Sequence, residues 1–307
     1  MSGGKLRAYW ELGKPRLSLF AVLAVVAGAY VAWPSRSSHP PLDLLVATTF
    51  GTFLAAIGAA SLNMYREREL DPLMKRTQNR PLPSGRLSPR EVLAFGLVTA
   101  TLGVLCVLVG AAPLAADGSR PVGQWNWCAG ALSAAIVVSY VLVYTPMKVR
   151  TPLNTLVGAI PGGLPPVVGH AAVAGHLAMP QAVLFAILFC WQIPHFLAIA
   201  WRYREDYARA GMLMLPVVDP TGYRTALTML LYVAGLGIAS FLPFVTGMVH
   251  PDYADRYAVV TLLLDVLFFV PTAFAALTRR DVAMRMTFAV SLVYLPLLFL
   301  TLVLTRQ

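Results

Sequence analysis

The chain has 307 residues, of which 58% are hydrophobic and only 12% are charged. Because a soluble domain usually carries about 25% charged residues, this composition excludes a soluble globular protein and predicts an integral membrane protein. The formal net charge of +10 comes mostly from loop residues at one membrane surface, as described below, so nucleic acid is a poor candidate partner.

Apolar runs long enough to cross a bilayer recur from one end of the chain to the other. A helical span needs about 20 apolar residues, and a helix satisfies its own backbone groups within lipid. We therefore expect an all-α, polytopic membrane protein with a single transmembrane domain over residues 17–304, preceded by an amphipathic lead over residues 1–16. The runs predict nine transmembrane helices, over residues 17–33, 44–62, 92–112, 125–145, 153–175, 181–200, 226–248, 257–277 and 285–304.

Lys and Arg residues gather in alternate loops, which indicates how the chain is oriented in the membrane. When the N-terminus is placed in the cytoplasm, the 24 basic residues fall on the cytoplasmic side except for Arg36, Arg120, Arg256 and Arg306. Since cytoplasmic loops carry an excess of positive charge, we expect a cytoplasmic N-terminus and an external C-terminus. The long loops at about 64–91 and 202–224 are then caps on the cytoplasmic surface.

The stretch from Leu62 to Pro89 follows the second apolar run and carries the most informative polar pattern. Asn63, Glu67 and Asp71 are spaced i, i+4, i+8, so on a helix their oxygen-bearing side chains share one face. Juxtamembrane carboxylates can simply pair with neighbouring cations, but the alignment of three oxygen donors favours a binding site. Basic residues surround this face, at Arg66, Arg68, Lys75, Arg76 and Arg80.

The fifth apolar run is rich in Gly and Pro at membrane depth, and such a helix is expected to break or kink. Broken helices are tolerated in a bilayer where they line a cavity or are buried in protein. Two interpretations remain open: small residues that let helices pack closely, or a flat wall against a bulky ligand. The loop before this run supplies Lys148 and Arg150 at the cytoplasmic surface.

A second polar cluster follows the sixth apolar run. Trp191 and His195 belong to an unusually polar and aromatic row for a spanning helix, and polar groups there tend to face a cavity. Just beyond this row, acidic, aromatic and basic residues occur together on the same side as the first cluster, among them Tyr203, Asp206 and Tyr207. Two such clusters facing each other resemble the halves of one site.

Carboxylates mixed with Arg and Lys at a membrane surface fit one ligand type, a diphosphate held through Mg²⁺. Carboxylate oxygens bind Mg²⁺, which commonly bridges to phosphate oxygens, while Arg and Lys take the remaining phosphate charge. The apolar interior would accept a long hydrocarbon tail. If the diphosphate leaves, an allylic cation forms and a nucleophilic π-system captures it, which is prenyl transfer. This chemistry predicts that Asp71→Ala abolishes turnover in a folded protein, because the site is exposed to the cytoplasm and not a packed core.

The same residues carry a family resemblance. Asn63-x3-Glu67-x3-Asp71 is similar to the first signature of the UbiA superfamily of intramembrane prenyltransferases, Asn-x3-Asp-x3-Asp. More narrowly, the chain resembles the protoheme IX farnesyltransferase (heme O synthase) family. The blocks that carry this resemblance lie within residues 11–218 and read LGKPRLSL, DPLMKRTQNRPLPSGRLSP, YTPMK, TPLNTLVGAIPGGLPPVVGHAA and WQIPHFLAIAWRYREDYARAGMLMLPVV.

The resemblance implies a UbiA-type helical bundle around a central cavity. It implies Mg²⁺-dependent transfer of farnesyl from farnesyl diphosphate to a vinyl group of heme B, with water addition, giving heme O for a terminal oxidase. The implied setting is the bacterial cell membrane, with the active site facing the cytoplasm and a heme A synthase as a partner. By matching blocks, Lys148 would contact the diphosphate, and the residues implied to hold Mg²⁺ are Asn63, Glu67, Asp71 and Asp206.

Further residues are implied to bind the substrates. Those on the diphosphate side are Arg66, Arg76, Arg80, Arg150, Tyr203 and Tyr207. Those near the heme are Trp191, His195 and, as a weaker candidate, His170.

Three positions depart from the family pattern. Glu67 stands where the superfamily has Asp, which keeps the carboxylate but moves it by a methylene group. Tyr203 stands where the second superfamily motif begins with Asp, a feature similar to heme O synthases. Lys148-Val149-Arg150 replaces an adjacent Lys-Arg pair, so Arg150 would reach the same phosphate from one position further on.

Two other functions fit parts of the pattern. A UbiA-type prenyltransferase for a phenolic ring, such as 4-hydroxybenzoate in quinone synthesis, would share the first motif. A transporter or heme carrier would suit the broken helix and the basic vestibule, but the carboxylates cluster on one side instead of continuing across the membrane. The blocks NTLVGAIPGGLPP and WQIPHF favour heme as the acceptor.

Overall fold

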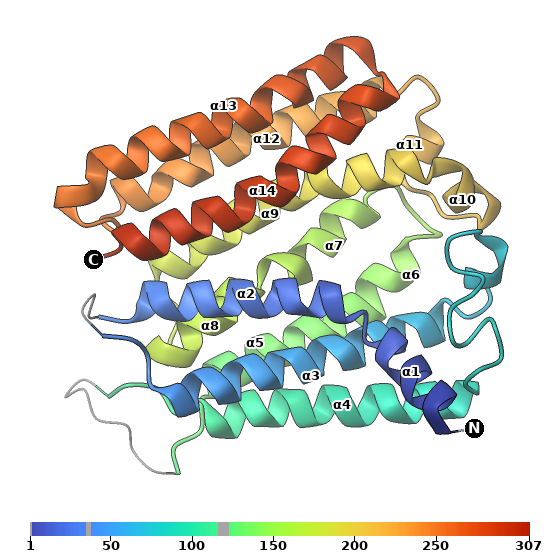
Figure 1. Ribbon diagram of the computed structural model, residues 1–307, viewed down its shortest axis with the longest axis horizontal. Coiled ribbons are helices and arrows are strands. Elements are labelled where there is room, and N and C mark those ends of the chain that lie inside the picture. Colours follow the sequence, from blue (N-terminus) through green and yellow to red (C-terminus); the bar gives the residue numbers. More distant parts are fainter. Residues whose placement is uncertain (1, 35–37, 116–122) are drawn as a thin grey trace.

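Helices make up most of the computed structural model, which describes residues 2–34, 38–115 and 123–307 (Figure 1). Arg36 and Arg120, two of the basic residues expected outside the cytoplasm, lie outside the described residues. The longer helices are α1 (Ser2–Leu12), α2 (Pro15–Ala32), α3 (Leu42–Arg66), α4 (Pro89–Gly110), α5 (Trp127–Val138), α7 (Asn154–Gly163), α8 (Pro165–Ala174), α9 (Met179–Arg202), α12 (Tyr223–Val245), α13 (Ala254–Thr278) and α14 (Asp281–Thr305). The short elements are η1 (Asp71–Leu73), η2 (Ser139–Tyr144), α6 (Thr145–Met147), α10 (Arg204–Arg209), α11 (Leu215–Val218) and η3 (Pro251–Tyr253).

Eight helices in the described part of the chain are long and apolar enough to cross a membrane, and the bent pair α1–α2 raises this number to nine. Two of these spans, Trp127–Met147 and Asn154–Ala174, join shorter helices end to end. The prediction of an all-α membrane protein with about nine spans is confirmed.

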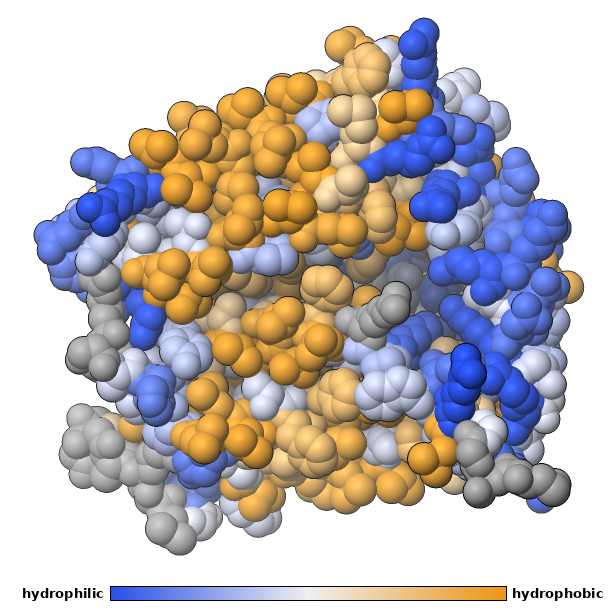
Figure 2. All heavy atoms as spheres, in the orientation of Figure 1, coloured by the Kyte–Doolittle hydropathy of each residue, from blue (hydrophilic) through white to orange (hydrophobic). Residues whose placement is uncertain are grey.

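The spans lie side by side, and their ends form two faces (Figure 1). Helices α10 and α11 and the loop between α3 and α4 gather at one face, here called the polar end, whereas α8 lies toward the opposite face. Hydrophilic residues lie at both faces and most densely at the polar end, and hydrophobic residues cover much of the flank between the two faces (Figure 2). This is the surface expected of a bundle that sits in lipid.

The Gly- and Pro-rich span divides at Leu164, between α7 and α8, as the sequence predicts. Its small residues allow neighbouring helices to approach closely. A Cβ atom on Gly169 would clash with the Val25 carbonyl of α2, and one on Gly162 would clash with the Gln192 side chain of α9. At these two positions the structure supports close helix packing rather than a flat wall against a ligand.

The C-terminal helices α12, α13 and α14 pack with α9 and α2 around one apolar core. Asp265 lies within this part of the bundle, where it accepts hydrogen bonds from Tyr294 Oη at 2.6 Å and from Ser240 Oγ at 2.9 Å. Asp265 therefore ties α12, α13 and α14 together, because a partly buried carboxyl inside the bundle needs such partners.

Candidate active site

Asn63 and Glu67 meet at the polar end of α3. Asn63 lies in the last turn, and its Nδ2 donates a hydrogen bond to Glu67 Oε2 over 2.7 Å. The regular helix ends at Arg66, but backbone bonds from Glu67 N to Asn63 O and from Asp71 N to Glu67 O continue the i→i−4 pattern. The predicted spacing therefore remains effective beyond the helix, as far as Asp71 at the start of η1.

Two basic side chains from other parts of the chain close this group of oxygens. Lys148 Nζ lies 2.6 Å from Glu67 Oε1 and 3.5 Å from Asn63 Oδ1. Arg80 Nη1 donates to both carboxylate oxygens of Asp71, at 2.7 and 2.9 Å, and lies 3.9 Å from Glu67 Oε2. We call these residues the primary cluster: Asn63, Glu67, Asp71, Arg80 and Lys148.

The primary cluster is buried, contrary to the expectation of a site exposed to the cytoplasm. Asp71 has no exposed surface and Glu67 is 5% exposed. The expected exposure of Asp71 is therefore wrong. Asp71→Ala would leave the largely buried Arg80 without its partner, so this variant is expected to lose stability as well as turnover. Asp71→Asn is the better probe, since it removes the charge and keeps the shape.

The pKa values of this cluster reflect burial opposed by ion pairing. Burial raises the pKa of Glu67, but the Lys148 ammonium more than offsets it and holds the pKa below its ordinary value. Burial lowers the pKa of Lys148, but Glu67 outweighs it and the pKa is raised. Burial raises the pKa of Asp71 above its ordinary value, more than the Arg80 guanidinium lowers it. Glu67 and Lys148 thus form a charged pair at neutral pH.

Thr145 and Tyr144 also contact the primary cluster, and the sequence analysis missed both. Thr145 Oγ1 lies 3.1 Å from Asn63 Oδ1, and Lys148 Nζ lies 4.6 Å from the centre of the Tyr144 ring. Both residues lie where the π-helical turn η2 joins α6, and π turns occur frequently at functional sites. Their only sequence signal is their position within the YTPMK block.

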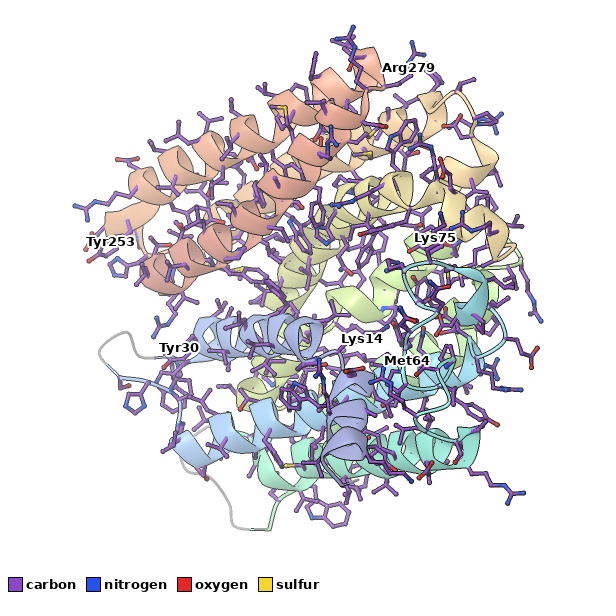
Figure 3. The ribbon with its side chains drawn as sticks, turned by 45° about the vertical axis from the view of Figure 1, so that its right-hand side comes forward. Lys14, Tyr30, Met64, Lys75, Tyr253 and Arg279 are labelled. Atoms are coloured by element: carbon purple, nitrogen blue, oxygen red, sulfur yellow. The ribbon has the colours of Figure 1, made fainter. Side chains whose placement is uncertain are left out.

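Lys14 is a further basic residue of this site that the sequence analysis did not single out. It precedes α2 with φ 44°, a left-handed conformation that is uncommon for a residue with a Cβ and is a feature of strained functional sites. Figure 3 shows Lys14 near Met64, at the end of α3. Burial, together with the charges of Arg80 and Lys148, lowers the pKa of Lys14 to about 7. In the sequence, a basic residue at the start of a span cannot be distinguished from one that only orients the chain in the membrane.

The second predicted cluster lies at the end of α9 and on α10. We call these residues the secondary cluster: Tyr203, Asp206, Tyr207 and Arg209. Asp206 forms an ion pair with Arg209, whose side chain is 41% exposed. The backbone N–H of Arg76 donates to Asp206 Oδ2 at 3.3 Å, and Arg76 Nη2 donates to Tyr207 Oη at 3.1 Å. The Arg76 guanidinium also lies 4.9 Å from the centre of the Tyr203 ring.

The loop over residues 71–80, which we call the cap loop, connects the two clusters. Asp71 and Arg80 at its ends belong to the primary cluster, while Arg76 in its middle binds the secondary cluster. Between them, Met74 is buried with Met212 and other apolar residues of the loop around α10 and α11. This packing brings both clusters to the polar end, under one cap.

The acidic residues do not form a three-carboxylate group. Within the described residues, no three side chains of His, Cys, Asp or Glu come together as a metal-binding group. Glu67 and Asp71 lie beside the Asn63 amide, whereas Asp206 is held by Arg209 and by the Arg76 backbone. The assignment of Asp206 as a metal ligand stays a prediction.

Trp191 and His195 belong to α9, and both contact α14. Their rings stack with centroids 4.7 Å apart. Trp191 Nε1 donates to the Ser291 carbonyl at 2.8 Å, and His195 Nδ1 lies 2.7 Å from Ser291 Oγ. His170 is buried in α8, toward the opposite face, and its Nδ1 has no hydrogen-bond partner among the described residues. The structure therefore does not bring these aromatic residues into either polar cluster.

The four predicted Arg residues divide into two pairs. Arg80 and Arg76 lie in the clusters described above, whereas Arg66 and Arg150 are exposed and form no ion pair within the described ranges. The roles of Arg66 and Arg150 stay predictions.

Comparison with known proteins identifies the family. The model of the UbiA prenyltransferase family matches residues 21–303. The chain belongs to the UbiA prenyltransferase family. It is 41% identical to a protoheme IX farnesyltransferase of Solibacter usitatus (strain Ellin6076) over 307 residues, which cover 98% of this chain and 99% of the relative. It is 39% identical to a protoheme IX farnesyltransferase of Sorangium cellulosum (strain So ce56) over 265 residues, 86% of this chain and 88% of the relative.

Solved structures share this UbiA fold at low sequence identity. A structure of digeranylgeranylglyceryl phosphate synthase has a TM-score of 0.75 and 17% identity, with 98% of each chain covered. A UbiA homolog from Archaeoglobus fulgidus bound to GPP and Mg²⁺ has a TM-score of 0.65 and 15% identity, with 96% of this UbiA-family chain and 99% of the homolog covered. The protein is therefore a membrane-embedded prenyltransferase with the UbiA fold, as the sequence resemblance implied.

Proposed function

We propose that the protein transfers the farnesyl group of farnesyl diphosphate to a vinyl group of heme B, with addition of water, giving heme O and diphosphate. The observation that carries this proposal is the primary cluster, where buried carboxylates and cations meet at the rim of an apolar bundle. It is supported by two relatives, both protoheme IX farnesyltransferases, which are 41% and 39% identical to this chain over most of their length.

Mg²⁺ is the metal that the family implies, and the donors of the primary cluster fit it. Mg²⁺ is usually held through one or two carboxylates, substrate phosphates and water. Glu67 and Asp71 supply two carboxylates. The Asn63 amide lies beside them, with its Nδ2 on Glu67 and its Oδ1 on the side of Thr145 and Lys148. Asp206 would add an oxygen from the secondary cluster. Bound there, the metal would neutralise diphosphate charge and make it a better leaving group.

The site has more basic side chains than carboxylates, so it favours the binding of an anion. Lys148 and Arg80 lie 2.6 and 2.7 Å from carboxylate oxygens of Glu67 and Asp71, and Lys14 adds a third basic side chain. With the carboxylates engaged by the metal, these cations would be free to hold phosphate oxygens through charge-assisted hydrogen bonds. Substrate binding thus exchanges internal ion pairs for contacts with the ligand.

The chemical step follows from this charge arrangement. The bond between farnesyl C1 and the diphosphate oxygen breaks with both electrons leaving on that oxygen, where Lys148 and Arg80 stabilise the developing charge. Tyr140 and Tyr144, with ring centroids 5.4 Å apart, precede Lys148 on the membrane side, where their π faces can stabilise the allylic cation. The vinyl π electrons of heme then bond to C1, and water adds to the resulting carbocation and releases a proton.

The proposed setting is the bacterial cell membrane, with the polar end in the cytoplasm. The concentration of Lys and Arg in the loops of this end supports that orientation. Both substrates would meet at this surface, the diphosphate under the cap and the hydrocarbon tail in the bundle. A heme A synthase is the proposed partner that receives the product.

The test is a mass spectrum of heme extracted after purified protein in detergent is incubated with heme B, farnesyl diphosphate and Mg²⁺. The expected product is heavier than heme B by one farnesyl group plus the elements of water, and it is absent when a chelator removes Mg²⁺. Heme that binds without reacting would contradict the proposal and indicate a carrier. Prenylation of a phenolic acid in place of heme would indicate a quinone-pathway enzyme.

A further inference from the structure

A cleft of about 480 Å³ lies at the polar end between α9 and α14, outside the primary cluster. Ligand pockets commonly have volumes of roughly 300–1,000 Å³. Its walls come from residues between 198 and 204, at the end of α9 and the start of α10, and from residues between 281 and 288 at the start of α14, with Arg76 reaching in from the cap loop. Hydrophilic residues gather at this end of the face shown in Figure 2.

The rim of the cleft has an excess of positive charge. Its basic lining residues are Arg76, Arg202, Arg204 and Arg285, against a single lining carboxylate, Asp281. Asp281 is already engaged: its Oδ1 accepts from Trp201 Nε1 at 2.7 Å and lies 3.6 Å from Arg204 Nη1. Arg202 and Arg285 form no ion pair within the described ranges. Two guanidinium groups are therefore available to an anionic ligand.

The floor of the cleft is aromatic and leads into the bundle. Phe288 lines the cleft, and its ring centroid lies 5.1 Å from that of His195. His195 in turn stacks on Trp191, one helical turn deeper along α9. A row of flat rings thus runs from the basic rim toward the membrane interior, which suits a planar ligand with acidic groups at one edge.

We propose that this cleft binds the two propionate groups of heme B, with Arg202 and Arg285 as their principal cationic partners and Phe288 against the porphyrin. The inference rests on the proposed function and adds the recognition of the acceptor. Arg suits this role because its planar fork pairs with a carboxylate through parallel hydrogen bonds.

Anchoring the propionates at the rim also orients the reaction. The vinyl groups of heme B lie on the edge of the porphyrin opposite the propionates. With the acidic edge at the polar rim, the vinyl edge points into the apolar bundle, where the allylic cation forms. Arg76 lines the cleft and also binds Asp206 and Tyr207, so the acceptor cleft adjoins the secondary cluster.

The experiment compares heme B with its dimethyl ester, which keeps the porphyrin and the vinyl groups but lacks the acidic charges. Initial rates are measured for wild type, for the Arg202→Gln/Arg285→Gln double variant, and for Arg280→Gln, a control on an exposed Arg that does not line the cleft. All are studied in nanodiscs of zwitterionic lipid, with a parallel set containing anionic lipid. Binding of farnesyl diphosphate to each variant verifies that it is folded.

For wild type, the KM for the ester is expected to be about tenfold or more above that for heme B, since the ester cannot form the charge-assisted contacts with Arg202 and Arg285. The double variant is expected to raise the KM for heme B to the ester value, to leave the KM for farnesyl diphosphate unchanged, and to lose the discrimination between the two hemes. Arg280→Gln is expected to behave as wild type.

An unchanged KM for heme B in the double variant would overturn the inference. A change seen only in discs with anionic lipid, with discrimination against the ester retained, would also overturn it and assign the cleft to lipid headgroups. If wild type forms no heme product at all, the proposed function fails by itself. Spectroscopic titration of heme B and its ester against the same variants then still tests whether the cleft binds propionates.

Discussion

The two charged clusters at the polar end differ in how they are held. The primary cluster joins residues far apart in the chain, is almost fully buried, and pairs each carboxylate with a cation from another element. The secondary cluster rests on the short helix α10, where the buried Asp206 pairs at i+3 with Arg209, whose side chain is 41% exposed. Removing one partner of a buried ion pair leaves an uncompensated buried charge and is strongly destabilising, whereas an ion pair with exposed side chains contributes little to stability. We infer that the primary cluster determines catalysis and that the secondary cluster adjusts it.

The largest expected effect comes from Asp71→Asn. The change keeps the side-chain shape but removes one of the two carboxylates proposed to hold Mg²⁺, so kcat/KM should fall by about 10³-fold or more. Heme formation is the measurement, and binding of heme B to the variant is the control for folding. Turnover within tenfold of wild type would remove Asp71 from the metal site.

Lys148→Met tests the cation of the same cluster. It removes a diphosphate contact and leaves the buried Glu67 with only the more distant Arg80 as a cation, so kcat/KM should fall by about 10²–10³-fold. Because Lys148 holds the pKa of Glu67 below its ordinary value, the variant should also lose activity at a higher pH than wild type as the pH falls. The matched control is Lys75→Met, an exposed lysine of the cap loop (Figure 3). Equal pH profiles in Lys148→Met and wild type would contradict the coupling.

Lys14→Met asks whether the primary cluster extends to α2. Loss of one cation beside Arg80 should raise the KM for farnesyl diphosphate by about tenfold, with little change in the KM for heme B. Lys14→Arg should recover part of the affinity. A KM for farnesyl diphosphate equal to that of wild type would limit Lys14 to orienting the chain.

Asp206→Asn measures what the secondary cluster adds. If Asp206 contributes a metal oxygen, the variant should bind Mn²⁺, used as a spectroscopic substitute for Mg²⁺, about tenfold more weakly in the presence of a diphosphate. Equal Mn²⁺ affinity in variant and wild type, measured by electron paramagnetic resonance, would restrict Asp206 to holding the cap loop.

Arg209→Gln should have the smallest effect. The Arg209 side chain is 41% exposed, and Asp206 keeps the hydrogen bond from the Arg76 backbone N–H when Arg209 is replaced. Loss of the pair should therefore cost about 1 kcal/mol, and thermal stability and turnover should stay close to wild type. A loss of turnover as large as that of Lys148→Met would break the distinction between the two clusters.

The fold was largely predictable because membrane spans are long and satisfy their own backbone bonds, so composition alone reveals them. The spacing from Asn63 to Asp71 was equally readable, since backbone bonds keep the helical register past the end of α3. The break at Leu164 followed from Gly and Pro, but its purpose did not, because whether Gly169 faces a ligand or α2 depends on tertiary packing.

The site was predictable only where its residues share a local pattern. Glu67 and Asp71 stand in one motif, but their burial depends on Lys148, Arg80 and the cap loop folding over them. Lys14 is far from that motif in sequence and looks like an ordinary positive-inside residue. The engagement of His195 by α14 was also hidden, because no sequence pattern links it to Ser291.

The most direct test of the central claim is calorimetric binding of a non-reactive thio analogue of farnesyl diphosphate, with and without Mg²⁺, to wild type and Asp71→Asn. The account predicts that Mg²⁺ tightens binding to wild type by about 10²-fold or more and has little effect on Asp71→Asn, because the buried carboxylates hold the metal against the diphosphate. An equal gain from Mg²⁺ in both proteins would contradict the claim that the primary cluster is the diphosphate site.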